Sequence, residues 1–168
     1  MQIRLGLKLN AAKTNRVYVS LGSNIQPEIQ IPAAVKWLDE SFELLAHSSI
    51  YQSPALGTAD PDFLNAAALI ETQHSANALK NTYFRPYEAS TGRVRSADKN
   101  APRPIDIDIL IYNNHLVELE LWDQAHLAVP LAQIYPDLRH SDGRSLKDIS
   151  LQLQSAGTVR QRRDILIR

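Results

Sequence analysis

The segment from residue 105 to residue 112 restricts the fold of this chain more than any other part of it. Four isoleucines alternate there with other residues: Ile105, Ile107, Ile109 and Ile111 against Asp106, Asp108, Leu110 and Tyr112. Strict alternation of β-branched residues predicts a β-strand. Because side chains two residues apart on a strand point to the same face, both carboxylates leave one face, about 7 Å apart.

The two aspartates on this predicted strand need a positive partner. Aspartate is depleted in strands, and two like charges on one face repel each other. A divalent cation with oxygen ligands resolves the repulsion, and Mg²⁺ usually takes one or two carboxylates together with phosphate oxygens. The alternative is that Asp106 and Asp108 mark the solvated face of an edge strand, although Leu110 and Tyr112, which continue that face, are not typical surface residues.

Arginines lie close to the aspartates in the sequence. Arg103 precedes the strand, and Arg93 and Arg95 lie a short loop earlier. Carboxylates for a metal ion beside arginines for phosphate groups are the usual equipment of phosphoryl transfer. The sequence therefore favours a metal-dependent phosphate site at the start of this strand.

Length and composition restrict the class of protein. The 168 residues fit one domain, and 18 basic residues balance 18 acidic ones, so net charge gives no support for a nucleic-acid or membrane partner. The chain has no cysteine, which fits a reducing compartment. No apolar run approaches the ~18 residues of a membrane span. We expect a cytoplasmic protein.

Residues 1–16 are expected to form an N-terminal extension ahead of a domain that spans residues 17–168. The extension carries four basic residues and no acidic one. Apolar residues alternate from Ile3 to Leu9, which predicts an added edge strand. A transit peptide is the alternative.

The remaining pattern predicts alternating strands and helices. Strands are expected at 17–21, 45–51, 63–71 and 105–112, and helices at 32–44 and 77–90, the second kinked or split at Pro86. Shorter elements are expected further on: a strand at 115–121, a helical turn at 130–134, a helix at 145–153 and a last strand at 165–167. This order predicts an α+β fold, a ferredoxin-like antiparallel sheet with helices packed on one side, in a single domain.

Four separated motifs now combine. They are Leu21–Asn24, Tyr51–Gly57, Asp60–Ala66, and Gly92–Arg95 leading to Pro102–Asp108. In this order they resemble the 6-hydroxymethyl-7,8-dihydropterin pyrophosphokinase family of folate biosynthesis. The resemblance covers roughly Val17 to Leu153.

The resemblance implies transfer of a pyrophosphoryl group from ATP to the hydroxymethyl group of a reduced pterin, leaving AMP. It implies two Mg²⁺ ions held by Asp106 and Asp108, and catalytic roles for Arg93, Arg103, Asp106 and Asp108. The residues that it places on the ATP side are Glu88, Arg93, Arg95, Lys99, Arg103, Ile109 and His126. For Glu88 and Arg95 the alternative is an ordinary solvated side chain.

The resemblance also implies a pterin pocket. Its expected residues are Gly22, Ser53, Pro54, Leu56, Phe63, Asn65 and Asp106. A flat heterocycle is best bound by an aromatic face and a few fixed polar groups, and Phe63 and Asn65, two apart on a predicted strand, share one face. Core and turn positions are the alternative for these two residues.

The sequence departs from the family pattern in two places. Asn100 stands where the family often has tryptophan, although the neighbouring Lys99 remains. The segment from Trp122 to Leu131 is shortened, so a second stacking aromatic has no clear counterpart. Trp122 either fills that role or packs in the core.

The competing functions are a diverged paralogue, with another substrate or weak activity, and a ferredoxin-like nucleic-acid-binding module. Asp106 and Asp108 disfavour the second, because without metal they repel phosphate. A Mg²⁺-dependent phosphohydrolase would not explain the motifs at 53–65. We expect ATP and a reduced pterin as substrates of a monomer, with no nucleic-acid or membrane partner.

Overall fold

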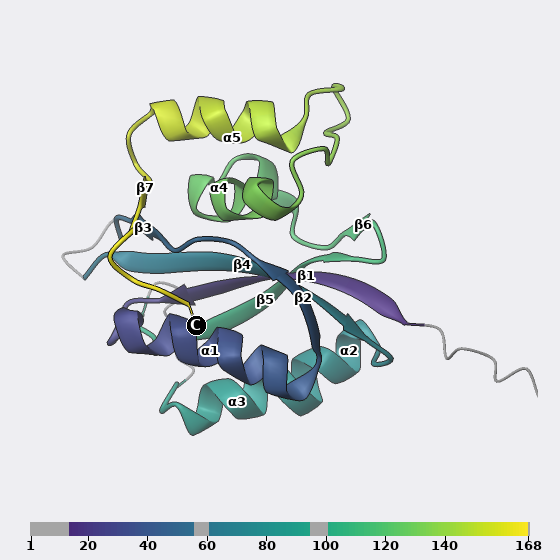
Figure 1. Ribbon diagram of the computed structural model, residues 1–168, viewed down its shortest axis with the longest axis vertical. Coiled ribbons are helices and arrows are strands. Elements are labelled where there is room, and N and C mark those ends of the chain that lie inside the picture. The colour runs from purple at the N-terminus through teal and green to yellow at the C-terminus, as the bar shows by residue number, and fades with distance from the viewer. Residues whose placement is uncertain (1–13, 56–60, 95–100, 168) are drawn as a thin grey trace, which may run out of the picture.

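An antiparallel β-sheet forms the centre of the protein, seen in a computed structural model that describes residues 14–55, 61–94 and 101–167 (Figure 1). Within these residues the sheet has seven strands, in the order β6-β5-β1-β4-β3-β7, with β2 also paired to β4. The central strands are β1 (Asn15–Ser23), β4 (Phe63–Thr72) and β5 (Asp106–Tyr112). These confirm the strands predicted at 17–21, 63–71 and 105–112.

The peripheral strands differ from the predicted ones. The strand expected at 45–51 is two strands, β2 (Glu43–His47) and β3 (Tyr51–Ser53), which both pair with β4. Ser48 separates them, because its hydroxyl accepts a hydrogen bond from the Ala67 N–H at 2.9 Å. The strand β6 (His115–Leu116) ends early, and a 3₁₀ helix, η2 (Leu119–Trp122), follows it. The strand expected at 165–167 is wrong; the last strand is β7 (Arg160–Gln161).

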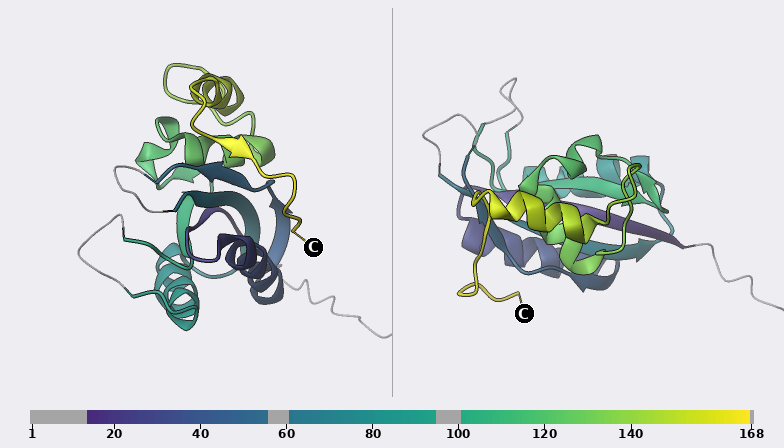
Figure 2. Two further views of the ribbon diagram at one scale, coloured as in Figure 1. Left: turned by 90° about the vertical axis from the view of Figure 1, so that its left-hand side faces the viewer. Right: turned by 90° about the horizontal axis from the view of Figure 1, so that it is seen from above.

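Helices cover both faces of the sheet (Figures 1 and 2). One face carries α1 (Pro27–Ser41), α2 (Ala76–Ala78), the π-helical η1 (Leu79–Phe84) and α3 (Arg85–Ser90). The other carries α4 (Ala125–Ile134) and α5 (Leu146–Ser155). The prediction of helices on one side was therefore wrong, while the α+β class and the antiparallel sheet are confirmed.

Two apolar cores explain the two helical layers. Val17, Val19 and Leu21 of β1 pack toward α1 and η1, whereas Tyr18 packs toward α4 and α5. Because alternate side chains of a strand point to opposite faces, a central strand with apolar residues on both faces needs cover on both sides. The apolar residues on the second face of the central strands therefore explain the layer of α4 and α5, which the sequence analysis did not predict.

Local sequence explains the ends of the helices. Pro27 lies in the first turn of α1, where its missing N–H costs nothing, so α1 begins five residues before the expected start. Pro86 does split the second helix, which changes from π-helical to α-helical geometry at Arg85. Ser145 caps α5 by accepting from the Asp148 N–H at 3.1 Å, as its sequence indicated. The helical turn expected at 130–134 is the second half of α4.

The alternation that predicted β5 holds only to residue 109. The pairing of β1 with β5 shifts between Tyr18 and Val19, so that Val19 pairs with Ile109 and Tyr18 with Ile111. The bulge at Leu110 turns Ile111 toward the α4 core and Tyr112 toward the α1 core. The two aspartates precede the bulge, and their shared face is unaffected.

The expected edge strand or transit peptide at residues 1–16 falls mostly outside the described residues. Among the helices that the structure describes, none is both long and apolar enough to cross a membrane.

Candidate active site

Three paired residues on neighbouring strands show where the candidate site lies in the sheet. Gly22 of β1 pairs with Asn65 of β4 on one side and with Asp106 of β5 on the other. Paired residues on neighbouring strands lie about 5 Å apart and point to the same face. The pairing therefore places the predicted pterin residue Asn65 and the predicted metal ligand Asp106 on either side of Gly22, on the face covered by α4.

A pocket of about 190 Å³ opens at this end of the sheet. It brings together nine of the residues predicted from the sequence: Gly22, Ser53, Pro54, Phe63, Asn65, Arg103, Asp106, Asp108 and His126. It is also lined by Ser20, Leu21, Ala55 and Leu127, which the sequence did not single out. Two of these, Leu21 and Ala55, lie inside the family-like motifs, which was the available signal.

Two arginines hold the carboxylate of Asp106. Arg103 Nη1 donates to Asp106 Oδ2 at 2.6 Å, and Arg93 Nη1 donates to Asp106 Oδ1. Burial opposes ionisation of Asp106, but the hydrogen bonds and charges of Arg93 and Arg103 outweigh it and hold the pKa of Asp106 below its ordinary value. Asp106 is therefore a carboxylate at neutral pH, already set among positive charges.

Asp108 lies in a different electrostatic environment on the same face. Desolvation by the surrounding protein, and then repulsion from Asp106, raise the pKa of Asp108 above its ordinary value, although Lys80 and Arg93 partly offset this and the residue keeps an exposed surface. A cation between the two carboxylates would relieve the repulsion. The described residues contain no cluster of three or more potential metal ligands, so any ion here would need oxygens from a substrate as well.

Glu88 lies behind β5 rather than in the pocket. The residue is 2% exposed, and Oε1 accepts from the Ile107 N–H at 3.0 Å and from Arg93 at 2.9 Å. Arg93 is thus fixed between Glu88 and Asp106, and the solvated alternative for Glu88 is wrong. The structure gives Glu88 the position of a residue that orients Arg93 from beneath.

The ring-binding end of the pocket is held by hydrogen bonds between β3 and β4. Asn65 Nδ2 donates to Ser53 Oγ at 2.9 Å and to the Tyr51 carbonyl at 3.3 Å. These bonds leave the amide oxygen of Asn65 on the side of Gly22, where a side chain at position 22 would meet it at 3.7 Å. The absence of a side chain at Gly22 therefore keeps the space beside an amide acceptor open.

Phe63 joins the two ends of the pocket. It is the first residue of β4, and the Arg103 guanidinium lies 6.0 Å from the centre of its ring. Among the described residues that line the pocket, no other phenylalanine, tyrosine or tryptophan occurs. Trp122 packs instead against the α4 core, with its ring 5.0 Å from that of His140. Of the two alternatives predicted for Trp122, packing in the core is therefore correct and stacking in the pocket is not.

The first turn of α4 closes the pocket opposite β5. His126 and Leu127 both line it. Burial lowers the pKa of His126, and the negative charges of Glu120 and Glu118 offset this only in part. His126 is therefore neutral at physiological pH and offers one donor and one acceptor nitrogen.

Asn24 is a positioning residue to which the sequence gave no role of its own, although it ends the family-like motif Leu21–Asn24. It is 3% exposed, and its Oδ1 accepts from the Arg103 N–H at 2.7 Å while its own N–H donates to the Arg103 carbonyl at 3.1 Å. Its Nδ2 donates to the Pro61 carbonyl at 3.4 Å. Asn24 thus ties the segment before β5 to the segment before β4.

The other predicted site residues lie elsewhere. Ile109 is partly buried and packs toward the α1 core, on the opposite face from Asp106 and Asp108. Leu56, Arg95 and Lys99 fall outside the described residues, as does Asn100. Their predicted roles stay predictions.

The fold and the pocket define a small α+β enzyme domain in which one cavity joins a ring-binding end to an end with arginines and carboxylates. Its sequence matches the family described as "7,8-dihydro-6-hydroxymethylpterin-pyrophosphokinase (HPPK)" over residues 18–136. The chain belongs to this family and is a pyrophosphokinase, which confirms the resemblance and the enzyme class predicted from the sequence.

Curated relatives and solved structures agree with this assignment. A 2-amino-4-hydroxy-6-hydroxymethyldihydropteridine pyrophosphokinase from Pseudomonas aeruginosa is 37% identical over 80% of this chain and 89% of its own length. One from Methylorubrum extorquens is 35% identical over 86% of this chain and 98% of its own. A crystal structure of a Plasmodium falciparum HPPK-DHPS triple variant matches with a TM-score of 0.67 at 10% identity, over 90% of this chain and 48% of that chain. At that identity the structural match supports the fold alone, and this chain spans about half the length of that protein.

Proposed function

We propose that this protein transfers the pyrophosphoryl group of ATP to the hydroxymethyl oxygen of 6-hydroxymethyl-7,8-dihydropterin, in folate biosynthesis, and releases AMP. One observation carries the proposal: Phe63, Asn65 and Ser53 line the same pocket as Arg103, Asp106 and Asp108. A flat polar heterocycle and a polyphosphate would thus be bound side by side. Family membership supports the same reaction.

The ring-binding end would select the pterin. Phe63 offers an apolar face, and Asn65, with its amide donors directed at β3, offers its carbonyl oxygen to a ring N–H. Ser53 Oγ accepts from Asn65, which directs its own hydrogen away from that residue. Pro54 and Gly22 complete the wall, and Leu56 extends it by resemblance.

The phosphate-binding end would stabilise the charge that develops in transfer. Arg93 and Arg103 are held by Asp106 and are preorganised for anionic oxygens. His126 would bind the nucleotide through one ring nitrogen. By resemblance, Glu88, Arg95, Lys99 and Ile109 belong to the ATP side, and Glu88 would act there through Arg93.

The carboxylates fit two Mg²⁺ ions. Asp106 and Asp108 would supply the hard oxygen ligands that Mg²⁺ prefers. The pKa of Asp108 is raised first by desolvation and then by repulsion from Asp106, and a bound cation would relieve the repulsion. When bound, the ions would neutralise the phosphate oxygens. Asp106 would orient the hydroxymethyl group of the pterin toward the phosphate end, because it lies between the two ends.

We further propose that residues 17–168 form the catalytic domain, with residues 1–16 as an extension, and that the enzyme works as a cytoplasmic monomer without a nucleic-acid or membrane partner.

Formation of AMP tests the proposed reaction. The protein is incubated with ATP and Mg²⁺, with and without the pterin, and AMP and ADP are quantified by chromatography. AMP that requires both the pterin and Mg²⁺ supports the proposal. The matched control is Asp108→Asn, which keeps the shape of the side chain and removes its charge. Pterin-independent AMP, or ADP as the nucleotide product, would contradict it.

A further inference from the structure

The chain after α5 forms a strap along the edge of the sheet, here defined as residues 159–167 (Figure 1). Its strand β7 pairs with β3, Gln161 with Tyr51 and Arg160 with Gln52. The Arg162 N–H also donates to the Ile50 carbonyl at 2.9 Å. The strap therefore lies directly beside the strand that carries Ser53 into the pocket.

Gln52 is the residue on which the polar contacts of the strap converge. Its Oε1 accepts from Arg160 Nη2 at 3.0 Å and from Arg162 Nη1 at 3.2 Å. Its Nε2 donates to Asp62 Oδ2 at 2.6 Å. Gln52 is not among the described residues that line the pocket, but it directly precedes Ser53, and its partner Asp62 directly precedes Phe63, and both Ser53 and Phe63 line the pocket.

The Gln52–Asp62 bond closes the base of the connection between β3 and β4. Gln52 precedes Ser53, and Asp62 precedes Phe63, which pairs with Ser53 across the two strands. The Gln52–Asp62 hydrogen bond therefore helps to position both Ser53 and Phe63. The two arginines fix the orientation of the Gln52 amide, because an oxygen that accepts from two guanidinium groups directs the amide nitrogen toward Asp62.

The strap also contacts the opposite wall. Val159 is 5% exposed and packs with Tyr51 and with Val129 and Ala125 of α4. Ala125 directly precedes His126, which lines the pocket. The strap is therefore in contact with both the β3 wall and the α4 wall.

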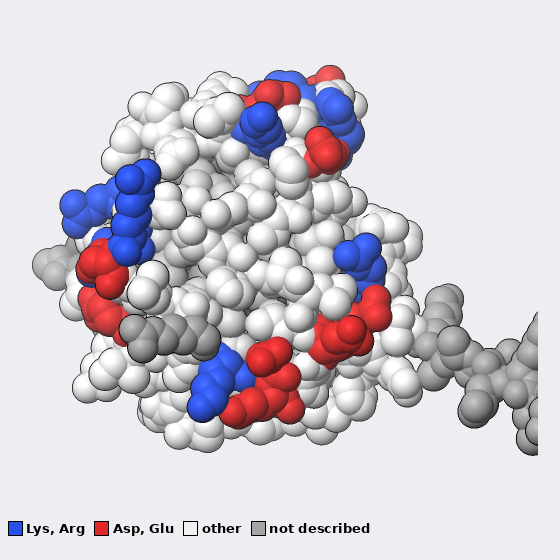
Figure 3. Space-filling view, in the orientation of Figure 1, with Lys and Arg blue, Asp and Glu red and all other residues white. Residues whose placement is uncertain are grey.

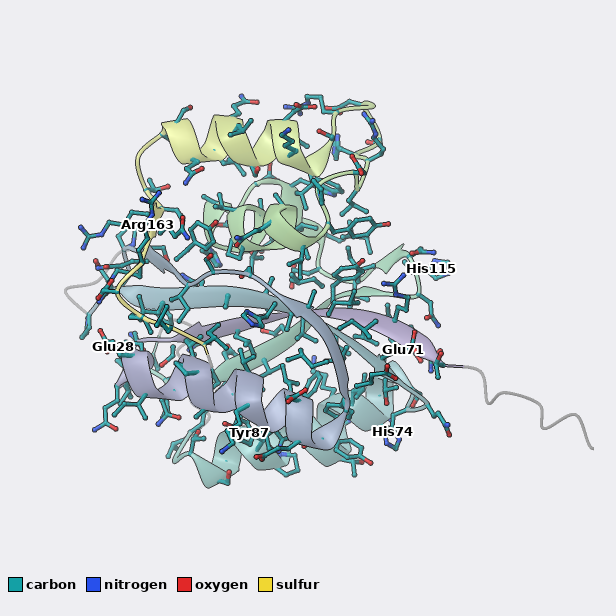
Figure 4. The ribbon with its side chains drawn as sticks, in the orientation of Figure 1. Glu28, Glu71, His74, Tyr87, His115 and Arg163 are labelled. Atoms are coloured by element: carbon teal, nitrogen blue, oxygen red, sulfur yellow. The ribbon has the colours of Figure 1, made fainter. Side chains whose placement is uncertain are left out.

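Arg162 connects the strap to the other helical layer. Its Nη2 lies 2.7 Å from Asp164 Oδ2, and its Nη1 lies 3.8 Å from Glu28 Oε1 on α1. Figure 3 shows basic and acidic side chains gathered along this edge, where Figure 4 labels Arg163 and Glu28. Arg163, by contrast, is exposed and has no hydrogen bond or ion pair with the described residues around it.

We propose that Arg160 and Arg162 are positioning residues for the ring-binding end of the pocket, acting through Gln52 on Ser53 and Phe63. They would determine affinity for the pterin and leave the arginines and carboxylates of the phosphate end, which lie on β5 and in the segments before it, unaffected. The inference rests on the proposed function for the identity of the ring. The contacts from the strap to both walls do not depend on it.

The test compares Gln52→Ala, the double variant Arg160→Ala/Arg162→Ala, the triple combination and the control Arg163→Ala, which removes an exposed arginine of the same strap. Exposed polar pairs of this kind contribute little to folding stability, so all variants should fold. KM for the pterin and for ATP is measured for each. Hydrogen exchange of β3 and of the first residues of β4 is measured without ligand.

We expect KM for the pterin to rise about three- to tenfold in Gln52→Ala and in the arginine pair. The triple combination should add little, because it removes one shared network. KM for ATP should stay within about twofold, and exchange at β3 should accelerate in the same variants but not in Arg163→Ala. Gln52→Glu, which keeps the acceptor for both arginines and repels Asp62, should show the same rise.

An arginine pair indistinguishable from Arg163→Ala in KM and exchange would overturn the proposal. Parallel rises in both KM values would also overturn it, because they indicate general damage. A wild-type protein that makes no AMP with this pterin would refute the proposed function instead, and the exchange comparison would still decide the positioning claim.

Discussion

Replacing Glu88 with alanine should destabilise this protein far more than replacing an exposed glutamate. The change leaves the Ile107 N–H without its acceptor at 3.0 Å and removes one carboxylate partner of Arg93. Removing one partner of a buried ion pair lowers the free energy of unfolding by ~3–5 kcal/mol. Of that total, the N–H group left without an acceptor accounts for ~1–3 kcal/mol. Arg93 keeps Asp106, so the lower end applies, about 3 kcal/mol.

Thermal unfolding measures this effect. At 2–4 °C per kcal/mol for a chain of this size, Tm should fall by roughly 6–12 °C. Glu88→Gln, which keeps an acceptor for Ile107, should lose less, about 1–2 kcal/mol. The matched control is Glu40→Ala, since Glu40 is a helical glutamate 63% exposed and 3.7 Å from Lys36.

The same variants separate two roles for Glu88. If Glu88 acts by orienting Arg93, kcat should fall in Glu88→Ala and be partly restored in Glu88→Gln, with KM for ATP little changed. A Tm equal to that of Glu40→Ala would refute the buried network. An unchanged Tm with a raised KM for ATP would instead make Glu88 a direct nucleotide ligand.

Three further predictions concern the pocket. At neutral pH without Mg²⁺, Asp106→Asn should lower Tm and Asp108→Asn should raise it, because the fold lowers the pKa of Asp106 and raises the pKa of Asp108. The gain in Asp108→Asn should fade as the pH falls through the raised pKa of Asp108, where the carboxylate takes up a proton. Equal Tm shifts in the two variants would contradict the assignment. Arg93→Ala should raise the activation free energy of the chemical step by about 3–4 kcal/mol, measured as a slower single-turnover rate. A change in ATP affinity alone would show that Arg93 only binds the nucleotide. Phe63→Ala should weaken pterin binding by about 1–3 kcal/mol and Trp122→Phe should not, both by fluorescence titration; the reverse order would place Trp122 in the pocket.

The central strands could be predicted from the sequence because each carries its own local pattern. The common face of Asp106 and Asp108 followed from alternation and is correct. The exchange of faces at Ile111 could not be predicted, because the bulge depends on how β5 pairs with β1. The second helical layer left a signal in the sequence: the segment from Leu64 to Ile70 is apolar except at Asn65. The structure buries all of these residues, as expected of a strand covered on both faces.

The site was predictable where its motifs are short and contiguous. Ser53, Phe63 and Asn65 meet in one pocket as the motifs indicated. Glu88 and Asn24 act through partners that lie 19 and 79 residues away in the sequence, and no local pattern reveals such pairs. For the strap, the apolar residues Ile165 and Ile167 suggested a strand, but they pack on the α1 core, while the polar pair Arg160–Gln161 forms the strand because β3 offers a free edge.

The identity of the transferred group tests the account most directly. ATP labelled at the β-phosphorus is incubated with the pterin and Mg²⁺, and the labelled pterin is analysed by mass spectrometry in single turnover. The account predicts that the pterin gains two phosphates in one step and that AMP forms in equal amount. A pterin with one phosphate together with ADP, or label released as free pyrophosphate while the pterin stays unmodified, would contradict it.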